Sequence, residues 1–498
     1  MKLFLSLFLF CILAGEGFAR AEGVVIGSKK FTESVVLAEV IHLLLESKNV
    51  SGKHIAELGG TRILWNALLA GNIDIYPEYS STIEDELLKT KFKSFAELKE
   101  KLAEQGIGIT APLGFNNTYA IGIKKARALS LGLSKISDLA RYPDFKMGLS
   151  EEFLQRRDGW PALKQTYKLP QSNLRGIDHD VAYRAMQSGD IDIIDLYSTD
   201  AEIQYYDLLV LEDDLKYFPR YEAVYLYRLE AAQREPNVLL ALKQLEGKIS
   251  ESTMIEMNRK AKIDKQASRD VAAAFLKEKF SVEIKSADEG LWHRIWLHTQ
   301  EHLKLVLISL FLAILVAIPL GIVAEKNNKI GQVILTLTGV IQTIPSLALL
   351  VILIKPLNLL GLTGIGDTPA LVALFLYSLL PIVRGTHAGL QQIPLSLRET
   401  SEVLGISFWS RLFRIDIPLA LPTILSGIKT AAVMNVGFAT LGALVGAGGY
   451  GQPILTGIRL DDYSLILEGA IPSAVLALGV QLFFDGIERF FVSPGLRK

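Results

Sequence analysis

The feature that most constrains the fold of this chain is an uncharged run, LVLISLFLAILVAIPLGIVA, at residues 305–324. A helix of this length crosses the hydrocarbon core of a bilayer, and its lack of charge suits that environment. Further apolar stretches follow at roughly 330–354, 366–383, 421–443 and 464–484. The sequence therefore predicts an all-α transmembrane domain over residues 305–498, with about five spans.

The basic residues between these spans are unevenly distributed. Lys and Arg are concentrated in the segments after the first, third and fifth spans, whereas the other two segments contain few. Because cytoplasmic loops are enriched in Lys and Arg, this pattern favours five spans with a cytoplasmic C-terminus. A sixth span would reverse the side of the last segment, and the sequence leaves that choice open.

The first 21 residues have the layout of a secretory signal peptide. One Lys precedes an apolar run of about a dozen residues, and Gly17-Phe18-Ala19 then forms a small-x-small site. A first transmembrane helix is the alternative, but the run is short for one. Cleavage near residue 21 would place the following domain in the periplasm and would remove Cys11, the only cysteine. The mature chain would then have no thiol chemistry.

Residues 22–285 have the pattern of an α/β domain. Short apolar strands alternate in this region with amphipathic helical stretches such as ESVVLAEVIHLLLES at residues 33–47. Such alternation predicts parallel sheets covered by helices. A polar and aromatic linker follows at residues 286–304, where Trp292 and Trp296 suit a membrane interface.

One short strand sequence occurs twice in this domain. GNIDIYPEYSST at residues 71–82 nearly recurs as GDIDIIDLYSTD at residues 189–200, so that Tyr79 corresponds to Tyr197. The repeat predicts two similar lobes, each of which ends a buried strand with a tyrosine at a shared cleft. Glu78, which precedes the first of these tyrosines, is either exposed to solvent or bridges the lobes.

Composition and motif spacing exclude several classes of function. The net charge of -1 gives no basis for nucleic-acid binding. No nucleophile–base set and no metal-ligand spacing occurs, so we predict no catalytic residue, no metal site and no cofactor bound by this chain. GAGGYG at residues 446–451 fits the dinucleotide pattern GxGxxG, but it follows a membrane span and not a strand, so we interpret it as a tight turn.

The largest basic segment, RETSEVLGISFWSRLFRIDIPLALP at residues 398–422, has a distinctive spacing. Glu399 is followed by two small hydroxyl residues, then by Gly405 and by Pro418. This resembles the coupling loop of ABC-importer permeases, in which the two small residues are alanines; an ordinary amphipathic loop is the alternative. The resemblance implies that residues 398–418 contact a cytoplasmic ATPase subunit. The chain has no GxxxxGK(S/T) loop, so ATP would be hydrolysed by that partner.

From residue 24 to about residue 230, the soluble part resembles the substrate-binding proteins for quaternary ammonium compounds of the glycine betaine, choline and carnitine type. IGSKKFTES, NNTYAIGI and GIDHDVAYRAMQSGDIDIIDLYSTDAEI carry the resemblance, and the membrane part is similar to the permease of the same systems. The family's ligand positions fall on Lys29, Tyr79, Thr82, Tyr119, Arg156, Tyr197 and Tyr221. Arg157 is an alternative to Arg156, and YSST replaces the commoner Tyr-Thr-Gly-Thr.

The resemblance also implies the fold and the assembly. We expect a two-lobed α/β periplasmic-binding-protein-like domain of type II, followed by an all-α transmembrane permease domain of the ABC type I importer class. Lobe 1 would comprise about residues 23–115 and 215–285, and lobe 2 residues 116–214. The permease would form a homodimer with two ATPase subunits in the bacterial cytoplasmic (inner) membrane, in contact with lipid.

The chemistry of this ligand class fits the tyrosines. A quaternary ammonium group has no N–H to donate, so it is held by the negative faces of aromatic rings, and each contact contributes about 0.5–2 kcal/mol. A ligand carboxylate would bind Arg156 in bidentate fashion and Lys29 at a helix start. For any one tyrosine, ordinary packing is the alternative.

The sequence therefore predicts the fused substrate-binding and permease subunit of an ABC importer for a quaternary ammonium compound. Two alternatives stay open. The same architecture would serve ergothioneine or another betaine-like compound, and a membrane-bound sensor would bind a ligand without transport. The coupling spacing argues against the sensor. The sequence does not name the compound or its role, whether osmoprotection or nutrient or antioxidant uptake.

Overall fold

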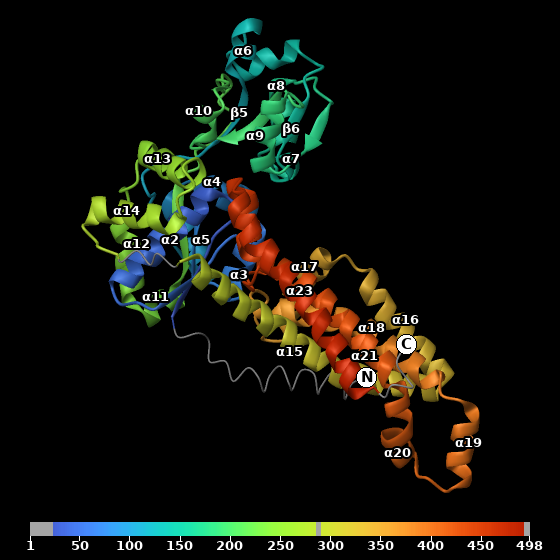
Figure 1. Cartoon of the computed structure of the whole chain (residues 1–498). Helices are drawn as coiled ribbons and strands as arrows, with labels where there is room; N and C mark the ends of the chain where they lie inside the picture. Colours follow the sequence, from blue (N-terminus) through green and yellow to red (C-terminus); the bar gives the residue numbers. More distant parts are fainter. Residues whose placement is uncertain (1–22, 285–289, 493–498) are drawn as a thin grey trace. The chain divides into compact units, whose positions relative to one another are not determined.

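The computed structural model describes residues 23–284 and 290–492. These two ranges belong to separate compact units (Figure 1), and each is described by itself. The signal peptide predicted at residues 1–21 lies outside the described residues.

The first unit contains two five-stranded mixed sheets. The first sheet has the strand order β2-β1-β3-β10-β4. Its parallel part consists of β2 (Gly52–Ile55), β1 (Val24–Gly27) and β3 (Ile75–Tyr79), while β10 (Ala223–Arg228) runs antiparallel between β3 and β4 (Ile107–Ile109). Every residue of β3 is buried, as expected for an inner strand whose two faces are covered.

The second sheet repeats this arrangement in the order β7-β6-β8-β5-β9. Here β7 (Leu174–Gly176), β6 (Met147–Leu149) and β8 (Ile193–Tyr197) are parallel, and β5 (Tyr119–Lys124) runs antiparallel between β8 and β9 (Leu208–Val210). The chain leaves the first sheet after β4 and returns after β9, so that β10 completes the first sheet. The predicted two-lobed α/β fold of type II is confirmed.

The central helix of the first unit is α2 (Thr32–Ser47), which follows β1 and is buried throughout its first two turns. It packs against α13 (Glu251–Lys262) and α14 (Ser268–Phe280). Burial on nearly every face explains its continuous apolar sequence. The remaining helical elements are α3 (Thr61–Leu69), α4 (Ser80–Thr82), η1 (Ile83–Leu88), α5 (Phe95–Ala103), α6 (Lys125–Leu131), η2 (Ile136–Arg141), α7 (Glu151–Gln155), α8 (Trp160–Tyr167), α9 (His179–Ser188), α10 (Glu202–Tyr205), α11 (Leu229–Arg234) and α12 (Pro236–Leu245).

The second unit, as described over residues 290–492, is built from helices. They are α15 (Leu291–Lys326), α16 (Asn328–Thr343), α17 (Ser346–Leu359), α18 (Asp367–Gln391), α19 (Leu395–Val403), α20 (Phe408–Arg411), η3 (Leu412–Asp416), α21 (Ile417–Ala439), η4 (Thr440–Val445), α22 (Gly451–Leu460) and α23 (Tyr463–Phe491). Four helical segments of the described chain are long and apolar enough to cross a membrane, and the bent pair α16–α17 makes five if it counts as one span. The predicted all-α membrane region is confirmed.

Two segments of this unit have features that the sequence analysis did not predict. The apolar stretch 330–354 is not one straight helix, because α16 and α17 are bent by 104°. Ile344, at the bend, has an extended conformation, and it precedes Pro345, whose ring disfavours a helical conformation in the preceding residue. In contrast, residues 291–304 of the predicted linker are the first turns of α15 and continue directly into the first span.

The core of the second unit forms around α18, which packs against α15 and α21. Asn435 on α21 is fully buried; its Nδ2 donates to Ser309 Oγ on α15, and its Oδ1 accepts from Ser378 Oγ on α18, both at 3.1 Å. Such polar contacts help helices associate in lipid, where apolar burial gives little driving force. At one end of the bundle, α19 and α20 extend beyond the other helices (Figure 1).

Candidate functional site

A cavity of about 260 Å³ lies in the first unit and is lined by residues from both sheets. All the ligand positions that the family resemblance implies line this cavity: Lys29, Tyr79, Thr82, Tyr119, Arg156, Tyr197 and Tyr221. Arg157, the alternative to Arg156, is exposed and is not among the lining residues. The structure therefore brings the predicted set together around one space.

The two corresponding tyrosines come from different sheets. Tyr79 is the last residue of β3, and Tyr197 is the last residue of β8. Phe31 lies between them, with its ring centroid 6.2 Å from that of Tyr79 and 5.5 Å from that of Tyr197. The sequence analysis did not select Phe31, although it directly precedes α2 in the stretch IGSKKFTES that carries the resemblance.

Tyr119 and Tyr221 extend this group of rings. Tyr119 begins β5 directly opposite Tyr197 on β8, and this antiparallel pairing places the two ring centroids 5.0 Å apart. The ring of Tyr221 meets that of Tyr119 edge to face at 5.9 Å, a geometry that aromatic pairs favour. The rings of Phe31, Tyr79, Tyr119, Tyr197 and Tyr221 thus form one connected aromatic lining.

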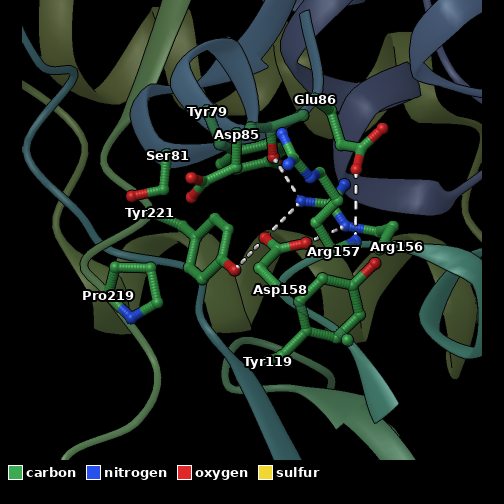
Figure 2. Close-up of polar contacts among 12 residues, drawn as sticks. Tyr79, Ser81, Asp85, Glu86, Tyr119, Arg156, Arg157, Asp158, Pro219 and Tyr221 are labelled. Carbon is green, nitrogen blue, oxygen red and sulfur yellow. Dashed lines mark hydrogen bonds and ion pairs between the residues drawn. The ribbon is translucent and has the colours of Figure 1, made fainter. Parts of the chain in front are cut away.

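The guanidinium group of Arg156 lies at the centre of a polar cluster. Its Nε and Nη2 donate to the two carboxylate oxygens of Asp158 at 2.8 and 2.6 Å, and Nη2 is also 3.4 Å from Thr82 Oγ1. Figure 2 shows Asp158 between Arg156 and Tyr221, whose hydroxyl donates to Asp158 Oδ2 at 2.5 Å. The guanidinium carbon also lies 5.3 Å from the centre of the Tyr119 ring. Arg156 therefore already has anionic and aromatic partners within the protein.

Lys29 has an equally close partner, Glu78. Both alternatives predicted for Glu78 are wrong: it is not exposed to solvent, and it does not bridge the lobes, because its partners Lys29 and Tyr79 belong to the first lobe. The carboxylate of Glu78 is fully buried and forms an ion pair with Lys29 Nζ. Glu78 Oε1 also accepts a hydrogen bond of 2.9 Å from the backbone N–H of Tyr79. Lys29 Nζ lies 5.3 Å from the centre of the Tyr79 ring. Lys29 and Glu78 therefore both interact with this tyrosine.

Glu33, in the first turn of α2, is a buried carboxylate that the sequence analysis missed. Its Oε1 accepts from Tyr79 Oη at 2.5 Å and Asn117 Nδ2 at 2.9 Å, and its Oε2 accepts from Thr199 Oγ1 at 2.5 Å and Asn258 Nδ2 at 3.1 Å. Burial raises the pKa of Glu33 above its usual value even though these four donors lower it. A glutamate in the first turn of a helix was visible in the sequence, but its partners are far away in the chain.

His179, at the start of α9, adds a charged group to the cavity lining. Its Nε2 is 2.9 Å from Asp200 Oδ2, and its ring centroid is 4.5 Å from that of Tyr197. Burial lowers the pKa of His179, but the charge of Asp200 outweighs burial and raises it to about 10. Within residues 23–284 and 290–492, no three His, Cys, Asp or Glu side chains are grouped so as to hold a metal ion.

The predicted coupling residues lie on and after α19 in the second unit. Glu399 is exposed on α19, Gly405 follows this helix with a φ of +68°, and Pro418 is exposed in the first turn of α21. Val403 and Leu404 are 87% and 70% exposed, which is unusual for apolar residues unless another surface covers them. The coupling loop predicted at residues 398–418 thus combines an exposed carboxylate with exposed apolar side chains.

Two protein families match the two units of the chain. Residues 22–278 match the substrate binding domain of the ABC-type glycine betaine transport system. Residues 317–494 match the inner membrane component of binding-protein-dependent transport systems.

The chain is also similar to individual proteins. The chain is 40% identical over 199 residues to the osmoprotectant import permease protein OsmW of Salmonella typhimurium strain LT2, covering 40% of this chain and 92% of the relative. It is 31% identical over 287 residues to the ergothioneine transport permease/ergothioneine binding protein EgtU of Helicobacter pylori strain G27, covering 55% of this chain and 51% of that protein. A crystal structure of a glycine betaine/carnitine/choline ABC transporter is 28% identical, with a TM-score of 0.44, and covers 51% of this chain and 98% of that chain.

The fold of residues 23–284, the helical unit at residues 290–492 and both family matches agree with the resemblance drawn from the sequence. The chain belongs to the binding-protein-dependent ABC importers of the glycine betaine type, and it joins the substrate-binding domain and the permease of such a system in one polypeptide.

Proposed function

We propose that the cargo of this importer is a compound with a quaternary ammonium group, of the glycine betaine, choline or carnitine class. The observation that carries the proposal is the connected aromatic lining of Phe31, Tyr79, Tyr119, Tyr197 and Tyr221 around one cavity. A quaternary ammonium group cannot donate hydrogen bonds, so ring faces are the protein groups that distinguish it from ammonium or a metal ion.

Binding would stabilise the closed arrangement of the two lobes. Several contacts already join the two lobes, including the hydrogen bond between Arg156 and Thr82 at 3.4 Å and that between Thr199 and Glu33. A ligand that touches rings from both sheets adds to these contacts only when the lobes are closed. The lobes would therefore close on the cargo by a hinge movement at the two crossovers.

We further propose that the energy for import comes from a separate cytoplasmic ATPase that binds residues 398–418. Support comes from the exposed Glu399 and from the exposed apolar side chains of Val403 and Leu404 on this segment. On this reading the permease domains form a homodimer with two ATPase subunits in the inner membrane, and the binding domain lies on the periplasmic side. Co-purification with an ATPase subunit tests the arrangement, and a sensor without transport would co-purify with none.

The ligand is tested with the full-length chain in lipid nanodiscs by isothermal titration calorimetry against choline, glycine betaine, carnitine and ergothioneine. We expect saturable binding of at least one of these compounds and no binding of ammonium or potassium ions. Absence of heat and of any thermal shift with all four compounds contradicts the proposal.

Ergothioneine is the second candidate, because the match to the Helicobacter pylori ergothioneine transport protein extends over 287 residues of that relative. Ergothioneine also has a trimethylammonium group, so the same rings would serve it. If it binds at least about tenfold more tightly than the other three compounds, it replaces them as the proposed cargo.

A further inference from the structure

Arg156 is the cavity residue best suited to bind a ligand carboxylate, and it already binds a carboxylate of the protein. Nε and Nη2 of Arg156 each donate to one oxygen of Asp158, at 2.8 and 2.6 Å (Figure 2). This is the two-bond fork in which a guanidinium group recognises any carboxylate. Asp158 therefore occupies one of the two edges of Arg156 and offsets its charge, which leaves a carboxylate on the cargo only the edge formed by Nη1 and Nη2.

Asp158 is also held from a second direction. The Tyr221 hydroxyl donates to Asp158 Oδ2 at 2.5 Å, so both carboxylate oxygens have donors. Burial raises the pKa of Asp158, but Arg156 and Tyr221 outweigh burial and keep this pKa below its usual value, so the side chain is ionised at neutral pH. Displacing Asp158 would leave a largely buried carboxylate without its cation, which is strongly unfavourable.

The second lining cation that could receive a ligand carboxylate is neutralised in the same way. Lys29 Nζ is 7% exposed and pairs with Glu78, which is fully buried. Glu78 is anchored in turn by the backbone N–H of Tyr79. Both cations that the family resemblance assigns to a ligand carboxylate thus have a buried protein carboxylate as partner.

The other carboxylates of the lining also disfavour an anionic group on the cargo, whereas Lys30, an exposed lysine of the lining, favours one. Four carboxylates line the cavity at the starts of α7 and α9: Glu151, Glu152, Asp178 and Asp180. Glu152 lines the same cavity as the rings of Tyr119 and Tyr197, and its negative charge adds to burial, the main cause, in raising the pKa of both tyrosines. The cationic His179 is itself paired with Asp200.

We propose that Asp158 is a specificity-determining residue: by occupying the fork of Arg156, it makes the cavity select a trimethylammonium cation that has no carboxylate, of the choline type, over zwitterions such as glycine betaine. The inference rests on the proposed function. It goes further because it predicts that compounds without a carboxylate bind more tightly than those with one, and it assigns this selectivity to Asp158.

The test compares the wild type with Asp158→Asn in the full-length chain in nanodiscs, by calorimetric titration with choline and with glycine betaine. We expect the wild type to bind choline at least about tenfold more tightly than glycine betaine. The Asn side chain keeps the shape but not the charge, so Arg156 becomes available to a ligand carboxylate. In Asp158→Asn we expect the affinity for glycine betaine to rise by about tenfold and that for choline to fall or stay unchanged.

Asp138→Asn is the matched control, because Asp138 also pairs with an arginine, Arg141, at 2.8 Å, but this pair is not part of the cavity lining. It should leave both affinities unchanged. Equal or tighter binding of glycine betaine by the wild type overturns the inference without any variant, so the test does not depend on the folding of Asp158→Asn. An unchanged affinity ratio in a folded Asp158→Asn protein also overturns it. If neither compound binds to the folded protein, the inference fails, and the proposed function fails as well only if carnitine and ergothioneine do not bind either.

Discussion

The hydroxyl group of Tyr79 donates a hydrogen bond of 2.5 Å to Oε1 of Glu33. The other oxygen of Glu33 accepts from Thr199, which follows β8 of the second sheet. The buried carboxylate of Glu33 therefore links Tyr79, a ring of the cavity lining in the first sheet, to Thr199 in the second lobe. The residues that line the cavity and the residues that connect the two lobes share this partner.

The aromatic lining predicts the effect of removing its tyrosines. We expect Tyr79→Ala and Tyr197→Ala each to weaken binding of a trimethylammonium compound by about 1–3 kcal/mol, because cation–π and packing contacts are lost. Tyr79→Phe keeps the ring and should cost less. Calorimetry on the full chain measures these changes. Tyr205→Ala is the control, since this side chain is 62% exposed; wild-type affinity in both alanine variants would contradict the role of the rings.

The buried Glu33 predicts a pH-dependent difference in stability. Its folded-state pKa is raised above the unfolded value of 4.5, so its contribution to stability is fully present below that pH and is lost as the pH rises through the folded-state pKa. Glu33→Gln lacks this titration. We therefore expect the Tm of Glu33→Gln, relative to wild type, to increase between about pH 4 and about pH 8.

Differential scanning fluorimetry of the full chain in nanodiscs measures this difference. Glu104→Gln is the control, because Glu104 has an exposed side chain, 62% accessible, and the substitution should shift the Tm by the same small amount at every pH. A Tm difference for Glu33→Gln that stays constant over the range would show that Glu33 has an ordinary pKa.

The turn after α19 predicts a separation between binding and transport. Gly405 has a φ of +68°, and a β-branched side chain in this left-handed conformation costs about 1–2 kcal/mol. We expect Gly405→Val, and also Glu399→Arg, to abolish uptake into proteoliposomes containing the ATPase while leaving ligand affinity unchanged. Gly361→Val is the matched control, with a φ of +75° outside residues 398–418. Loss of binding together with uptake would argue against separate roles for the two units.

The polar contact within the helical unit predicts a loss of stability that is independent of ligand. Asn435→Leu removes the hydrogen bonds to Ser309 and Ser378, and we expect it to destabilise the unit by about 1–2 kcal/mol. Thermal unfolding in detergent measures the change. Thr430→Ala is the control, because the Thr430 hydroxyl bonds only within its own helix, to Ser426 O at 2.8 Å. Equal effects of the two substitutions would mean that the contact between helices adds no stability.

Local patterns predicted the classes of structure and one relationship inside the site. The uncharged run at residues 305–324 lies within α15, and the repeated strand ends in Tyr79 on one sheet and Tyr197 on the other. The first prediction depends on neighbouring residues alone, and the second on the likeness of two short stretches. The bend within the apolar stretch 330–354 was not predicted, because the extended residue before Pro345 decides it.

By itself, the sequence determined that part of this chain is an all-α membrane region, that the other part is an α/β domain, and that two corresponding strands end in tyrosine. These features follow from hydrophobic periodicity and from the requirement that a helix in lipid satisfy its own backbone. Only the tertiary structure decided that Asp158 pairs with Arg156 and that Glu33 connects the two lobes. Glu33 and Thr199 are 166 positions apart. Only the order of the strands and the two connections between the sheets, from β4 to β5 and from β9 to β10, bring such distant side chains within hydrogen-bonding distance.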